Sequence, residues 1–157
     1  MTKRMLVGIA LSVLVFSVAG CAGSTGTTTQ KAVLDDFSNR ATRGQVWVYW
    51  NCSKQDGVLT VEGVAVQPGY PSPTRDLKFT LEGVDGRGTV VSKGQAAAQD
   101  LIMYQMEQNP FRVAVRTVGA ENRFNLTYTY WLHVAGTVVD ADSDEHEVVA
   151  RNACPAR

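Results

Sequence analysis

Few residue types in this 157-residue chain could support catalysis. Its histidines are His133 and His146, and a hydrolase needs a nucleophile, a base within reach and a group that orients the base. The sequence contains no Gly-x-Ser-x-Gly elbow, no zinc-protease motif and no Cys-His nucleophile pair. His133 falls on the polar face of a predicted strand, where an exposed histidine is the simplest interpretation. We therefore expect no enzymatic activity, no catalytic residues and no cofactor.

An acidic stretch from Asp140 to Glu145 begins like a calcium-binding loop, with oxygen donors at alternate positions. An EF-hand requires Gly at the sixth position of its loop and Glu at the twelfth. This chain has Glu145 and Arg151 there. The stretch is interpreted as a solvated turn. Weak binding of a divalent ion stays open, but no metal site is predicted.

The N-terminal segment, residues 1–20, has the organisation of a secretory signal peptide. Lys3 and Arg4 form a short basic region, and Leu6 to Val18 contains no charged residue. This run is shorter than the roughly 20 residues that a membrane-spanning helix requires, and small residues follow it. The alternatives are a signal peptide with a coincidental cysteine at its end, or a buried N-terminal helix.

The segment leads into Val18-Ala19-Gly20-Cys21, which resembles the lipobox of bacterial lipoproteins. The resemblance implies that Cys21 becomes the first residue of the mature chain, with a diacylglyceryl thioether on its sulfur and usually a third acyl chain on its amine. Two or more acyl chains anchor a protein stably. We expect a membrane-anchored, periplasm-facing protein. In a Gram-negative source the outer membrane is favoured over the inner one, because Ala22 rather than Asp follows Cys21.

The charge balance excludes one class of partner. Fifteen basic residues balance fifteen acidic ones, so no basic excess neutralises phosphates and nucleic acid is not an expected partner. Two of the basic residues, Lys3 and Arg4, belong to the signal segment. The mature chain is therefore slightly acidic, and lipid rather than a polybasic patch is the expected anchor.

If Cys21 is acylated, Cys52 and Cys154 remain as an even pair in an oxidising compartment. A disulfide between them would close a span of 102 residues. The chain-entropy model gives such a loop about 4–5 kcal/mol of stabilisation, although measured values are often smaller. A redox or metal-binding pair is the alternative, but no Cys-x-x-Cys motif and no adjacent histidine supports it.

The polarity pattern divides the mature chain into a tether and one folded domain. Residues 21–44 begin with the Gly- and Thr-rich segment Ala22 to Thr29, whose composition is typical of a flexible linker. A short helical turn within Gln30 to Arg40 would bring Val33, Leu34 and Phe37 to one side. The folded domain is predicted to occupy residues 45–157.

From Gln45 onward the apolar residues recur with a period of two, which predicts half-buried strands. Turn sequences with glycine separate the candidates, and Gly63 predicts a bulge. The predicted fold class is all-β, an antiparallel Ig-like or transthyretin-like β-sandwich. The candidate strands are Gln45–Cys52, Val58–Gln67, Leu77–Glu82, Phe111–Arg116 and Arg123–Val134.

A series of short patterns occupies the region from Val58 to Leu132: Val61–Gly63, Leu81–Asp85, Gly88–Val91, Pro110-Phe111 and Phe124–Tyr130. In this order they resemble the small Ig-like domains of bacterial envelope lipoproteins loosely called FxLYD-like. The chain departs from that signature, because Leu81, Gly83 and Val84 replace its Phe, Leu and Tyr. The resemblance implies an extracytoplasmic domain of binding or scaffolding type, without catalytic residues.

Aromatic side chains supply one set of candidate binding residues. Trp131 falls on the non-core face of the strongest predicted strand, and Trp47 shares a face of the first strand with Tyr49. If these faces were open and adjacent, they would form an aromatic platform for a sugar or a protein partner. The favoured alternative is that strands at the C-terminal end of the chain cover them.

Two loops supply the other candidates, Tyr70 and Tyr104. Gln67 to Arg75 holds three prolines around Tyr70, whereas Gln99 to Pro110 is rich in large apolar residues. Soft apolar surface of this kind suits partner binding, although it more often closes the end of a sandwich. The leading hypothesis is a non-catalytic envelope lipoprotein that binds or scaffolds an unidentified envelope protein. The alternative is a small-ligand or glycan binder that uses exposed aromatics.

Overall fold

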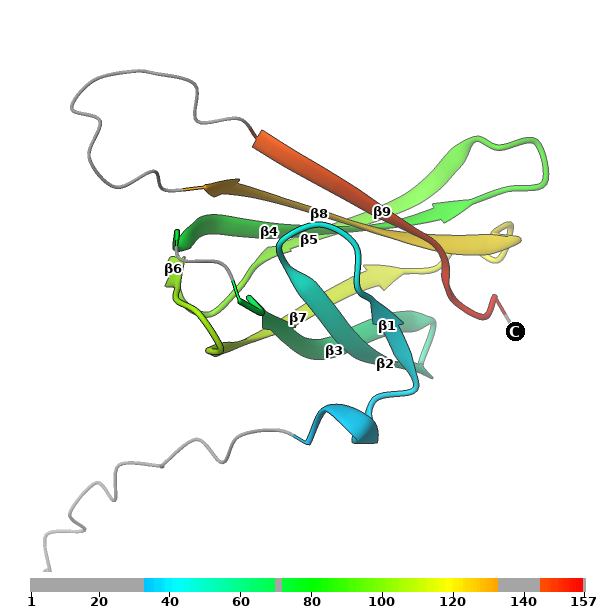
Figure 1. The fold of residues 1–157 in the computed structure, drawn as a ribbon. Helices are drawn as coiled ribbons and strands as arrows, with labels where there is room; N and C mark the ends of the chain where they lie inside the picture. The colour runs from blue at the N-terminus through cyan, green and yellow to red at the C-terminus, as the bar shows by residue number, and fades with distance from the viewer. Residues whose placement is uncertain (1–32, 70–71, 133–144, 157) are drawn as a thin grey trace, which may run out of the picture. The chain divides into compact units, whose positions relative to one another are not determined.

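The computed structural model describes residues 33–69, 72–132 and 145–156, which belong to one compact unit, Lys31–Arg157. Cys21, Tyr70, His133 and the acidic residues 140–144 lie outside the described residues. Within the described part, a short 3-10 helix, η1 (Leu34–Asp36), precedes nine strands (Figure 1). The strands are β1 (Asn39–Ala41), β2 (Trp47–Gln55), β3 (Val58–Val66), β4 (Thr74–Val84), β5 (Val90–Ala97), β6 (Ile102–Met103), β7 (Gln108–Arg116), β8 (Arg123–Leu132) and β9 (Glu145–Cys154).

The strands form two antiparallel sheets. Sheet A has the order β1-β2-β3-β7, and sheet B has the order β5-β4-β8-β9, with β6 paired to β4 (Figure 1). The predicted all-β class and its antiparallel, Ig-like sandwich are therefore confirmed. Among the described residues, no helix is long and apolar enough to cross a membrane.

The core lies between the two sheets and follows the alternation of the sequence. Sheet A contributes Val48 and Val113, for example, and sheet B contributes Phe124 and Tyr128; all four are essentially inaccessible to solvent. The rings of Phe79 in β4 and Phe111 in β7 stack across the interface with their centroids 3.7 Å apart. Burying a side chain of this size contributes about 1.5–3 kcal/mol. The burial of every second side chain of these strands thus holds the two sheets face to face.

The alternation of the sequence does not predict two of the long strands, β5 and β9. Both lie at edges of sheet B. Their inward side chains are small or only partly apolar, as with Gly94 and Ala96 in β5 and Val148 and Ala150 in β9. Because an edge strand buries less apolar surface, its hydrophobic period is weak in the sequence.

The predicted bulge at Gly63 is wrong. The pairing of β3 continues without a shift through Gly63, which lies opposite Trp50 on one side and Phe111 on the other. A Cβ atom at this position would overlap the backbone carbonyl of Tyr49 and lie 2.9 Å from the Trp50 Cα. The glycine is required by the close approach of neighbouring backbone, which the sequence pattern does not distinguish from a bulge.

The folded domain begins before residue 45, inside the segment assigned to the tether. The β1 strand pairs with β2, and Leu34 and Phe37 pack on the outer face of sheet A. The predicted short helical turn is present as η1. A three-residue strand is too short to produce a period-two signal, and for this reason the sequence pattern does not reveal β1.

Candidate interaction surfaces

A disulfide joins Cys52 in β2 to Cys154 at the end of β9, with the two Cα atoms 5.9 Å apart. The predicted pairing is confirmed. Because β2 belongs to sheet A and β9 to sheet B, the bond links the two sheets. Cys154 is 3% exposed, which is typical of a structural crosslink and not of a redox pair that must meet a substrate.

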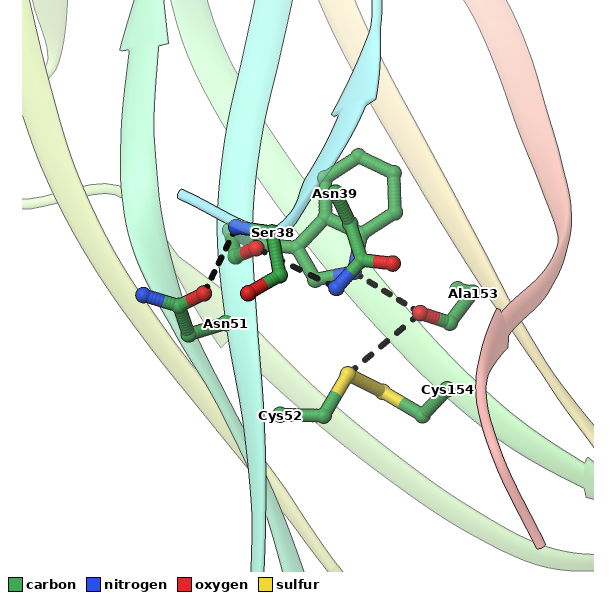
Figure 2. The surroundings of a disulfide bond; sticks show 7 residues. Ser38, Asn39, Asn51, Cys52, Ala153 and Cys154 are labelled. Atoms are coloured by element: carbon green, nitrogen blue, oxygen red, sulfur yellow. Dashed lines mark hydrogen bonds between the residues drawn. A yellow bond between two sulfur atoms is a disulfide. The ribbon is translucent and has the colours of Figure 1, made fainter. Parts of the chain in front are cut away.

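Hydrogen bonds surround this crosslink (Figure 2). The Trp50 Nε1 donates to the Ala153 carbonyl at 3.0 Å, and the Asn39 side chain donates to the Trp50 carbonyl at 3.3 Å. The Cys52 sulfur also lies 3.3 Å from the Ala153 oxygen. This is a close contact and not a hydrogen bond, because a sulfur within a disulfide carries no proton.

The two candidate tryptophans do not form one platform. Both sheets direct their even-numbered residues inward here, with Val48 and Trp50 in β2 and Tyr128 and Tyr130 in β8. Trp47 therefore faces outward from sheet A, and Trp131 faces outward from sheet B. They lie on opposite faces of the sandwich, so the shared aromatic platform is excluded by geometry.

Trp47 is covered on its own face, but not by the C-terminal strands. It packs in a small apolar cluster with Tyr49, Val64 and Val66, over which Leu34 and Phe37 lie. The covering residues come from the segment that precedes β1. Trp47 is half-buried and therefore contributes to packing on sheet A.

Tyr104 lies in an exposed apolar loop around β6. Its side chain is 55% exposed, and those of Leu101, Ile102 and Met106 are 72%, 48% and 56% exposed. Met103, in contrast, is 1% exposed and belongs to the core. A single buried side chain thus attaches a loop that presents four large apolar groups to solvent.

The register of sheet B places this loop beside Trp131. Ile102 lies opposite Arg75, and Arg75 lies opposite Trp131 on its other side. Residues directly opposite each other in an antiparallel sheet project from the same face, with Cβ atoms about 4.5–5.5 Å apart. We define the β6 surface as the three residues of this row together with the other exposed apolar residues of the loop: Arg75, Leu101, Ile102, Tyr104, Met106 and Trp131.

Backbone hydrogen bonds order the loop. The Asp76 N–H donates to the Leu101 carbonyl, and the Met106 N–H donates to the Gln67 carbonyl, each at 2.9 Å. The Tyr104 N–H donates to a carboxylate oxygen of Glu107 at 2.8 Å. Each donor and acceptor is thereby fixed at a defined place, and the loop presents its apolar groups in one arrangement.

Two of these hydrogen-bonded residues adopt left-handed backbone conformations. Asp76 has φ 53° and Met106 has φ 62°. For a residue other than glycine this conformation costs about 1–2 kcal/mol. Local strain of this kind is concentrated at functional sites and persists only where the surrounding contacts impose it. Met106 is the strained residue of this loop, whereas Asp76 lies in β4 and the left-handed conformation also occurs at Asp56 and Asn152.

Gln67 is a site residue that sequence reasoning misses. Its side chain is inaccessible to solvent, donates to the Ser72 carbonyl and accepts from the Thr74 N–H at 3.2 Å. The Gln67 side chain therefore joins the two ends of the 67–75 loop. Its backbone carbonyl, which accepts from the Met106 N–H, connects this loop to the one that contains Met106. A buried glutamine is indistinguishable from an exposed one in a single sequence, so no pattern marks it.

The described histidine is part of the core packing. The imidazole of His146 stacks on the ring of Tyr130 with the centroids 5.2 Å apart. His146 lies on the inward side of β9, next to Val148. Within residues 33–69, 72–132 and 145–156, no three His, Cys, Asp or Glu side chains are grouped so that they could hold a metal ion.

Comparisons with known proteins assign no family. The sequence matches no protein-family profile and no curated protein. Two of the solved structures that match are the following. The crystal structure titled yeast GGA1 GAE domain-P21 has a TM-score of 0.45 and 10% identity, and the match covers 71% of this chain and 94% of that one. A β-glucuronidase from glycoside hydrolase family 2 has a TM-score of 0.33 and 12% identity, and the match covers 65% of this chain and 11% of that one.

Proposed function

We propose that this protein is a non-catalytic envelope lipoprotein that binds or scaffolds another envelope protein through the β6 surface. The observation that carries the proposal is the exposure of four large apolar side chains on a hydrogen-bonded loop, one of which, Ile102, is in register with Arg75 and Trp131. A protein partner would remove these apolar groups from water, and the burial of their surface would contribute favourable free energy to binding.

The composition of the β6 surface supports a protein partner. Trp, Tyr, Met and Arg are the residues enriched in protein interfaces, and Trp, Tyr and Arg most often dominate the binding energy. All four types occur among its six residues. Because hydrogen bonds already order the backbone of the loop, binding incurs little additional loss of backbone freedom.

The proposed attachment to the envelope rests on the lipobox-like sequence that ends at Cys21 and on the FxLYD-like pattern of residues 58–132. An acylated Cys21 followed by a flexible tether would hold the sandwich at a membrane surface outside the cytosol, with the outer membrane favoured. Mass spectrometry of the native chain tests this part. We expect an N-terminus at Cys21 that carries acyl chains. A soluble native chain that still begins at Met1 would exclude the anchor.

Site-specific photocrosslinking in intact cells tests the partner. A benzophenone side chain is placed at Tyr104, and in a matched strain at Arg87, an exposed position in the turn at the opposite end of β4. We expect one protein adduct from position 104 that is missing from position 87. The proposal requires that the adduct disappear when Leu101 and Met106 are both replaced by serine. Adducts of equal intensity from the two positions would contradict it.

The glycan-binding alternative retains only part of its site, because Trp47 lies on the other sheet. Its remaining described candidates are Trp131 and Tyr104. Titration of tryptophan fluorescence with soluble peptidoglycan fragments tests it, with Trp131→Phe as the control. The protein-partner proposal expects no change of emission. A saturable change that Trp131→Phe removes would favour the glycan.

A further inference from the structure

A second surface lies on the other side of the sandwich, between the edge strands β1 and β9. At the opposite side, β5 and β7 are in close contact, since a Cβ on Gly94 would overlap the Ala114 carbonyl. In the described part of the chain, β1 ends sheet A and β9 ends sheet B (Figure 1). A cleft of about 690 Å³ separates them.

The cleft has the dimensions of an extended polypeptide. Its walls are two continuous segments, residues 39–43 and residues 148–153, with Trp50 between them. The pairing of β9 is regular from Glu145 to Ala150, whereas the register shifts after Ala150 and Asn152 has φ 55°. At about 3.3 Å per residue the regular part of the β9 edge, which reaches the cleft at residues 148–150, spans roughly 20 Å. The two walls run in opposite directions. At one end Gly44, which follows the first wall, approaches Val148. At the other end Trp50, which is the strand partner of Asn39, donates a hydrogen bond to Ala153.

The charge of the cleft differs from that of the chain as a whole. Three arginines, Arg40, Arg43 and Arg151, are among the residues that line it, and no aspartate or glutamate is. All three arginines are exposed. The ion pairs found in the described residues involve other basic side chains. Arg40 lies opposite Tyr49 and therefore projects from the outer face of sheet A, at the rim of the cleft. The three guanidinium groups are available to an anionic ligand at that rim.

Buried tyrosines hold one wall in place. The single proton of the Tyr128 hydroxyl is shared between the Val46 carbonyl at 3.2 Å and the Arg43 carbonyl at 3.4 Å. The Tyr130 hydroxyl accepts from the Gln45 N–H at 3.1 Å. Burial, together with the neighbouring Tyr130, raises the pKa of Tyr128 above its ordinary value of 10.0, so its hydroxyl remains a donor. The β1 wall is thus preorganised.

We propose that this cleft binds an acidic polypeptide segment, which adds as an extended strand to the free edge of β9 while its carboxylates pair with the three arginines. Strand addition supplies affinity through main-chain hydrogen bonds, and side chains at alternate positions supply specificity. The β9 edge is favoured over β1 because β1 has only three residues. The site is separate from the β6 surface, and its failure would leave the proposed function intact.

The first test measures charge recognition. The probe is a fluorescein-labelled hexapeptide of alternating Glu and Val with blocked ends, and fluorescence polarisation follows its binding to the full chain. We expect saturable binding that weakens by about tenfold in Arg40→Gln/Arg43→Gln/Arg151→Gln, because three exposed ion pairs are lost. Arg87→Gln/Arg116→Gln/Arg123→Gln makes the same change of net charge outside the cleft and should bind normally. Equal loss in both triple variants, or no binding to the unmodified chain, would overturn the proposal.

The second test measures strand addition. Two further hexapeptides carry N-methyl groups on either the odd or the even amides, which removes the N–H donors from one edge of the peptide at a time. One of them should bind about tenfold more weakly than the parent, because main-chain hydrogen bonds to β9 are lost. If both bind as tightly as the parent, the peptide does not add as a strand.

Two other anions complete the test. Inorganic phosphate and vesicles of phosphatidylglycerol are compared as competitors of the labelled peptide. Under the proposal neither phosphate nor the vesicles displace the labelled peptide. A hexapeptide of alternating Lys and Val at the same concentration is the negative control and should not displace it either. Displacement by phosphate or by vesicles that depends on the three arginines would identify a simple anion or lipid site and overturn the peptide proposal. Circular dichroism and thiol titration verify that each variant is folded and oxidised.

Discussion

The indole nitrogen of Trp50 donates a 3.0 Å hydrogen bond to the carbonyl of Ala153, although 103 residues separate the two in the chain. Cys52, two residues after Trp50, forms the disulfide with Cys154, which directly follows Ala153. The same junction between sheet A and sheet B is therefore closed twice, once by a covalent bond and once by a buried hydrogen bond. The end of β9 is held at a side of the sandwich where β1 and β9 leave a cleft.

Removal of the disulfide should lower stability without changing the fold. In Cys52→Ala/Cys154→Ala we expect the free energy of unfolding to fall by about 2–5 kcal/mol, because the unfolded chain regains the freedom of a long loop. Urea unfolding of the variant and of the reduced parent measures this, and the two should agree. A midpoint that does not respond to reductant in the parent would show that the crosslink has no stabilising effect.

The hydrogen bond of Trp50 can be removed separately. Trp50→Phe keeps an aromatic ring in the core but leaves the Ala153 carbonyl without its indole donor. We expect a loss of about 1–3 kcal/mol, seen as a lower urea midpoint while the disulfide stays intact. If Trp50→Phe is as stable as the parent, the carbonyl is satisfied in another way.

Gly63 should tolerate no side chain. Gly63→Ala places a Cβ against the Tyr49 carbonyl in the middle of sheet A, and we expect a loss of about 3 kcal/mol or more, because backbone must move. Gly86→Ala is the matched control. Its Cβ would meet only the flexible Asn122 side chain, at 3.1 Å. Thermal unfolding should separate the two variants clearly, and similar melting temperatures would contradict the close approach.

The stacked phenylalanines should dominate the packing between the sheets. Phe79→Ala is expected to cost about 3–5 kcal/mol, because it opens a cavity beside Phe111. A double-mutant cycle with Phe111→Ala should give a coupling of about 0.5–1.5 kcal/mol beyond the area effect. Chemical denaturation of the four proteins measures it, and strictly additive losses would argue against the stacked contact.

Glu121 should make stability depend on pH in the acidic range. Burial tends to raise the pKa of its carboxyl, but hydrogen bonds from the Val118 N–H, the Ser92 hydroxyl and the Gly119 N–H outweigh this effect and hold the pKa below 4.5. A lowered folded pKa contributes stability above pH 4.5 that is lost as the pH falls through the folded value. Glu121→Gln should therefore be less stable than the parent at neutral pH, with the difference shrinking below pH 4.5. Parallel stability curves from acidic to neutral pH would exclude this contribution.

The sequence predicts the strands with strict alternation and names single residues of the β6 surface, but it does not predict which of these residues are neighbours. Alternation in Phe124 to Tyr130 predicts one buried face because a half-buried strand must place every second side chain in the core. The same alternation places Trp47 and Trp131 on outward faces, but it does not say whether two such faces are neighbours. The structure answers that question against the shared platform, because the two strands belong to opposite sheets.

The sequence by itself determined the all-β class, the inward residues of β4, β7 and β8 and the only pairing open to Cys52 and Cys154 once Cys21 is assigned to a lipid. Each of these follows from local periodicity or from a count of residue types. The tertiary structure alone decided that Ile102, Arg75 and Trp131 lie in one row and that three arginines line the cleft between β1 and β9. Such neighbours come from strands far apart in the chain. Their meeting depends on the order and register of the sheets, and these are set by the packing of the whole core.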